Sequence, residues 1–184
     1  LWVLTAAISL FAMPVFALMP VFARDEFGAG ALTLGALLTA AGAGQLVGAA
    51  VLALGRYGLA RVRRSGLLQL LGCLVMGLLL AGFGLAEAPV AAAVALFGFN
   101  FVYGFLAPRV NAMVQSRADA ERGTAQALFL VVFGLVPIGQ VMLGWAALEV
   151  GAGLATIVAG LVIMAVSALT LVGAGGLRNY VVSE

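Results

Sequence analysis

The run GLLQLLGCLVMGLLLAGFGLA, residues 66–86, decides the fold. It carries no charge, and its length is close to the roughly 20 residues that an α-helix needs to cross the hydrocarbon core of a bilayer. A lipid-facing β-strand would be about half as long and would alternate polar with apolar residues. The run therefore predicts a transmembrane helix.

Five further uncharged apolar runs, two before it and three after it, also predict transmembrane helices. With the first run, the expected spans are 1–23, 32–55, 66–86, 90–108, 124–148 and 154–174. We therefore expect an all-α, polytopic membrane protein in which residues 1–184 form one six-helix transmembrane bundle.

The composition supports a lipid environment and excludes several functions. Hydrophobic residues make up 65% of the chain and charged residues 9%, too few to cover a soluble domain of this size. All basic residues are arginines placed mainly between apolar runs, which is not the pattern of a nucleic-acid-binding face. With no histidine and only Cys73, we expect no metal site, disulfide or cofactor.

The arginines also predict the orientation in the membrane. They gather after the second and fourth spans and in the tail, whereas Glu87 and Glu149 stand in the third and fifth connections. Because positively charged loops stay in the cytoplasm, both termini are expected there, in agreement with an even number of spans.

Proline and glycine predict how the helices bend and pack. Pro14 and Pro20 in the first span and Pro137 in the fifth remove backbone donors, so we expect kinks at these three positions. Gly44 and Gly48 allow the second span to approach a neighbouring helix closely.

Several motifs together resemble one family. Residues 19–28 (MPVFARDEFG) and 34–44 (LGALLTAAGAG) are similar to the seventh and eighth helices of major facilitator superfamily exporters, in the drug-efflux branch that includes the enterobactin exporter. Residues 115–123 (QSRADAERG) resemble that branch's loop between the tenth and eleventh helices, and Pro137-Ile138-Gly139 with Gly144 resembles the eleventh.

This resemblance implies the C-terminal half of a twelve-helix transporter, built from two inverted three-helix repeats. Gly44-Gln45 in the second span is echoed by Gly139-Gln140 in the fifth, the position that such a repeat pairs with it. The chain begins with Leu1 inside an apolar run, so we expect it to be a fragment whose partner is an N-terminal six-helix half. The implied location is the bacterial inner membrane, and the implied activity is export of small drug-like or siderophore-like molecules by alternating access.

The resemblance also points to the cytoplasmic loops. In the superfamily's Gly-x-x-x-Asp-Arg-x-Gly-Arg-Arg motif, Arg56 and Gly58 match, whereas Gly55 replaces the aspartate. Arg122 and Gly123 match in the later loop. We assign these four matching residues to cytoplasmic gating or to membrane topology.

Neutral polar side chains inside the spans are the candidates for a substrate path. Asn100 and Tyr103 lie on one face of the fourth span, which also carries Asn111, and the second and fifth spans offer Gln45, Gln126 and Gln140. Amides bind a polar substrate without a buried charge, but they also bond neighbouring helices. No carboxylate lies inside a span, so if a proton drives transport, its acidic carrier is expected in the other half.

Two other classes of function fit a six-helix membrane protein less well or equally well. An intramembrane enzyme needs paired acids, a Ser-His pair or metal ligands at membrane depth, and the spans carry none. A non-catalytic six-helix protein, such as a permease subunit or a scaffold, stays open as the alternative to a transporter.

The gating role of Arg56 is testable by substitution. If its guanidinium pairs with a helix end or an acid in the transport cycle, Arg56→Gln lowers transport while membrane insertion stays normal. Transport assays with quantification of inserted protein measure both. Unchanged transport would leave Arg56 only its topological role.

Overall fold

The described part of the chain is helical and contains no strand. The computed structural model describes residues 2–28, 30–54, 65–115 and 119–173. Six stretches of it are long and apolar enough to cross a membrane: Val3–Glu26, Gly30–Leu54, Gly66–Gly84, Pro89–Ala112, Gln126–Val150 and Ala152–Val172. The prediction of an all-α fold with six membrane spans is confirmed.

Four spans are continuous helices and two are divided. The second, third, fourth and sixth spans are α3 (Gly30–Leu54), α4 (Ser65–Gly84), α5 (Pro89–Gln115) and α8 (Ala152–Gly173). The first span consists of α1 (Trp2–Ala7), the π-turn η1 (Ile8–Ala12), α2 (Val15–Val21) and the π-turn η2 (Phe22–Glu26). The fifth consists of α6 (Asp119–Phe133) and α7 (Val136–Val150).

Proline explains the main division in each divided span. Pro14 has no N–H for the Leu10 carbonyl, and the turn before it widens so that the Met13 N–H reaches the Ile8 carbonyl at 3.0 Å. Pro137 lies in the first turn of α7, where a missing N–H costs nothing, and α6 ends just before it. Pro20 stays inside α2, and η2 begins two residues later.

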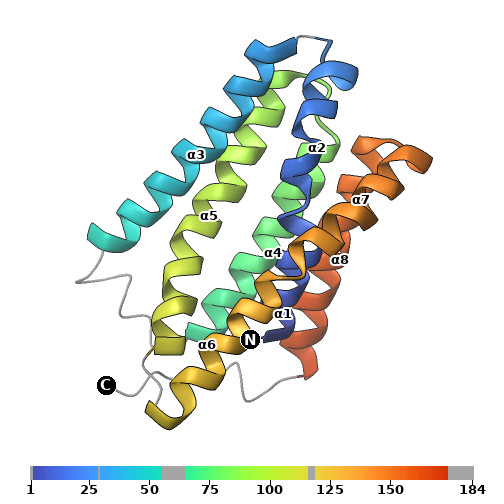
Figure 1. Ribbon diagram of the computed structural model, residues 1–184. Helices are drawn as coiled ribbons and strands as arrows, with labels where there is room; N and C mark the ends of the chain where they lie inside the picture. The colour runs from blue at the N-terminus through green and yellow to red at the C-terminus, as the bar shows by residue number, and fades with distance from the viewer. Residues whose placement is uncertain (1, 29, 55–64, 116–118, 174–184) are drawn as a thin grey trace.

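Two helix pairs form the tightest contacts of the bundle. α3 lies along α5, and α4 lies along α8, as Figure 1 also shows. Between α3 and α5, a Cβ added to Gly44 or Gly48 would overlap the backbone at Phe97 or Phe101, and one added to Gly104 would overlap Gln45. Small residues thus bring the backbones together where lipid provides no hydrophobic drive.

The contacts have the two-fold relation of an inverted repeat. The second span packs on the fourth through Gly44, and the fifth packs on the first through Gly139, whose added Cβ would overlap the Leu10 carbonyl. The third span of one repeat, α4, packs on the third of the other, α8. The Gly-Gln echo in the sequence therefore marks equivalent helix crossings.

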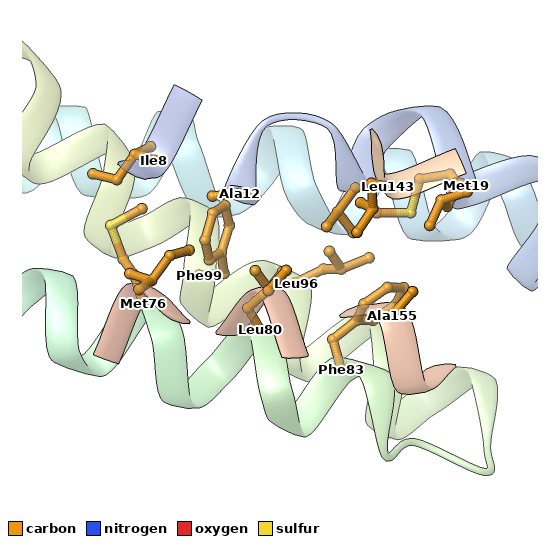
Figure 2. Close-up of a cluster of buried hydrophobic side chains, with 14 of the residues drawn as sticks. Ile8, Ala12, Met19, Met76, Leu80, Phe83, Leu96, Phe99, Leu143 and Ala155 are labelled. Carbon is orange, nitrogen blue, oxygen red and sulfur yellow. The ribbon is translucent and has the colours of Figure 1, made fainter. Parts of the chain in front are cut away.

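The hydrophobic core lies where the first, third, fourth and sixth spans meet. Figure 2 shows Met76, Leu80 and Phe83 of α4 facing Leu96 and Phe99 of α5. At one end of this core, the rings of Phe22 and Phe83 lie 4.5 Å apart between centroids, tilted by 49°. The core ties the first span to the α4–α8 pair.

Two helix boundaries differ from the expected ones. α5 does not end at Pro108 but continues to Gln115, and α6 already begins at Asp119. Arg122 and Gly123, expected in a loop, therefore lie in the first turns of α6. Arg56 and Gly58 lie outside the described residues.

The close packing of α4 on α8 predicts unequal effects for two glycines of α4. Gly77→Ala would place a Cβ 2.7 Å from the Gly160 carbonyl oxygen, so we expect a loss of about 1–3 kcal/mol in stability and a lower unfolding temperature in detergent. Gly82 has nothing within 4 Å of an added Cβ, and Gly82→Ala should keep or raise that temperature. Equal shifts for the two variants would contradict this packing.

Candidate functional site

The candidate site is a cavity of about 320 Å³ that is lined by the first five spans. Its lining residues lie toward the end of the bundle where α1 begins and where α3 and α5 end. α8 contributes none of them. The volume falls within the range of about 300–1,000 Å³ that is typical of small-molecule sites.

One part of the cavity wall is polar but uncharged. Each of four spans supplies at least one such side chain: Thr5 and Ser9 from the first, Gln45 from α3, Gln69 from α4, and Tyr103 and Asn111 from α5. Hydroxyl and amide groups both donate and accept hydrogen bonds. This part of the wall can therefore orient a polar ligand at membrane depth.

The other part of the wall is apolar and includes aromatic rings and methionines. Phe129 and Phe133 of α6 lie 5.2 Å apart between ring centroids, tilted by 42°, and both line the cavity. Met13 and Met76 line it from the first and third spans. Methionine adapts its shape easily and aromatic rings give large contact areas, so this wall suits a flat or irregular apolar group.

Among the residues that the structure describes, none of those that line the cavity is charged. The nearest charge along the chain is Arg109, which follows the lining residue Pro108 in α5. Its guanidinium carbon lies 5.9 Å above the centre of the Phe105 ring, one turn earlier. Among the described residues, no group of three histidine, cysteine or acidic side chains could hold a metal ion.

The structure brings two of the five predicted path residues to the cavity. Gln45 and Tyr103 line it. Asn100 does not: it is buried, and its Nδ2 donates to the Leu96 carbonyl oxygen at 2.9 Å. Gln126 is half-buried and Gln140 exposed, and neither lines the cavity.

Sequence reasoning missed Ser9, Gln69 and Thr5. Gln69 is the one polar side chain inside the run that decided the fold, and that interruption is a signal that could have singled it out. Ser9 and Thr5 are four residues apart in the first span, a helical spacing that hydroxyl groups share with many structural positions.

A model of the family described as Major Facilitator Superfamily matches residues 1–139. The chain belongs to this superfamily. No curated protein and no solved structure gives a match. The described residues that line the cavity, from Thr5 to Phe133, fall inside the matched region. Members of the Major Facilitator Superfamily are transporters, so membership supports a transport function.

Water access to the cavity can be measured with cysteines. Ala107 lines the cavity, whereas Leu78 on α4 is 60% exposed on the outside of the bundle. The native Cys73 is fully buried and should not react with the reagent. In the full-length protein in membranes, we expect Ala107→Cys to react several-fold faster than Leu78→Cys with an impermeant methanethiosulfonate, because thiolate forms only where water reaches. Equal rates would argue against a water-filled cavity.

Proposed function

We propose that this chain is one six-helix half of a secondary active transporter that exports small amphipathic molecules by alternating access. The observation that carries the proposal is the cavity at membrane depth, with a polar wall from four spans and an aromatic wall from α6. A cargo that is partly apolar and partly hydrogen-bonding matches both walls. Superfamily membership supports transport, and the resemblance to the drug-efflux branch supports the outward direction.

The proposed partner is a second six-helix half, N-terminal to this one. The second and fifth spans are the least covered of the six, with 22% and 17% of their apolar windows buried. Large apolar residues are exposed on both, among them Leu46 of α3 and Trp145 of α7. A second half packed against these two spans would close the open side of the cavity and form the path between the halves.

Coupling and location complete the proposal. No acidic residue is among the described residues that line the cavity, so we propose that a proton, if it drives export, is carried by an acid of the other half. The arginine pattern supports cytoplasmic termini, and the resemblance supports the bacterial inner membrane. In this orientation the cavity lies in the cytoplasmic half of the bundle, where an exporter would load its cargo.

The test is transport by the full-length protein reconstituted in liposomes, with Tyr103→Phe as the probe of the cavity. Loss of one hydrogen bond to cargo should lower transport efficiency by a factor of about 3–10. Thr156→Val is the control, because Thr156 is also a hydroxyl residue inside a span but donates to the Ala152 carbonyl at 2.8 Å and does not line the cavity.

Two results would contradict the proposal. Equal losses for Tyr103→Phe and Thr156→Val would remove the cavity from the transport path. No movement of any amphipathic solute by correctly inserted protein would favour the alternative of a non-transporting scaffold.

A further inference from the structure

The hydroxyl of Ser9 is buried without a hydrogen-bond partner. Ser9 is 2% exposed and lines the cavity, and its side chain forms no hydrogen bond in the described part of the chain. Four other hydroxyls in these helices each donate to the carbonyl four residues earlier, at 2.6–2.8 Å: Thr39, Thr156, Ser167 and Thr170. Ser9 is therefore an exception to the way this bundle satisfies its hydroxyl groups.

The exception coincides with the π-turn η1, Ile8–Ala12. Single π-turns inside α-helices are frequent at functional sites, because they rearrange the side chains of the helix locally. Ile8 and Ser9 of this turn line the cavity, as does Met13 directly after it. The turn thus places a polar group among the apolar residues of the first span.

The Ser9 oxygen opens onto the cavity. No fully enclosed side-chain nitrogen or oxygen among the described residues lacks a partner, so this unpaired hydroxyl is not sealed in the protein. A hydroxyl kept from bulk water without a partner costs free energy. A ligand in the cavity can supply that partner.

Three other polar side chains of the cavity also have hydrogen-bonding atoms without a partner. Gln45 and Tyr103 form no side-chain hydrogen bond in the described part. Gln69 donates only a long contact of 3.8 Å to the sulfur of Cys73, which leaves its carbonyl oxygen without a donor. Together with Ser9, these groups offer donors and acceptors from four different spans.

The described lining residues offer no countercharge. None of them is ionised at neutral pH, and Arg109 lies over the Phe105 ring. An ion in contact with these residues would lose hydration without gaining an opposite charge from them, whereas an uncharged polar group would lose only hydrogen bonds that the wall replaces.

We propose that the cavity binds uncharged molecules that carry hydroxyl or amide groups beside an apolar ring, and that Ser9 is the polar anchor in the first span. This inference rests on the proposed transport function and names its cargo class. Ser9 and the two glutamines hold the polar groups of the cargo, and Phe129 and Phe133 contact its ring.

The experiment compares three aromatic probes in liposomes that contain the full-length protein. Chloramphenicol is the uncharged probe with hydroxyl and amide groups, tetraphenylphosphonium the cation and fluorescein the anion. We expect movement of chloramphenicol above protein-free liposomes and little movement of either ion. Movement of an ion without chloramphenicol would overturn the cargo class but keep the transport function. Movement of none of the three would overturn both.

The role of Ser9 is tested with matched serine variants. Ser9→Ala should raise the KM for chloramphenicol about 3–10-fold with little change in kcat, and Ser9→Thr, which keeps the hydroxyl, should recover most of the loss. Ser167→Ala is the control, because Ser167 is fully buried in α8 and donates to the Ile163 carbonyl. Equal KM values for Ser9→Ala and Ser167→Ala would overturn the anchor and leave Ser9 no role beyond packing.

Discussion

The lack of water in the hydrocarbon core requires that every backbone N–H and C=O finds a partner within the protein. Four spans meet this requirement as unbroken helices. The first span is divided at Pro14, and the fifth is divided just before Pro137, whereas α5 stays continuous with Pro108 inside it. The Leu10 carbonyl, which Pro14 leaves without its usual donor, faces Gly139 of α7, where the missing side chain lets the two backbones touch. Ser9 and Met13, which lie on either side of Leu10 in the chain, line the cavity, so the interrupted part of the first span forms one wall of the site.

Length and charge were enough to predict the number and type of the spans, because an uncharged run of about 20 residues has few alternatives to a membrane helix. The ends of α5 and α6 were not predictable in the same way. Apolar patterning stops at the membrane surface, whereas α5 runs on past Pro108 to Gln115. The glycine echo at Gly44 and Gly139 carried more information than composition alone, since each marks a helix crossing.

The site was predictable only in part. Gln45 and Tyr103 stood out as polar residues in apolar helices, and both line the cavity. Asn100 fitted the same pattern, but its side chain donates a hydrogen bond to the Leu96 carbonyl of its own helix. Residue spacing in the sequence does not show which partner an amide bonds. Ser9 depends on a π-turn, and a widened turn leaves no trace in hydrophobic periodicity.

The close helix contacts at glycines distinguish rigid helix pairs from spans that can bend. α3 and α5 approach closely at three glycines, and α4 and α8 at two further crossings, so sliding one helix along its partner would bring larger side chains into these contacts. We therefore expect the α3–α5 and α4–α8 pairs to be the most rigid parts of the bundle. We expect the first and fifth spans to bend more easily, because their regular α-helical hydrogen bonding is interrupted. We therefore expect a change in the width of the cavity to move mainly the two spans that carry Ser9 and the Phe129–Phe133 pair, and to move α3, α4 and α5 less.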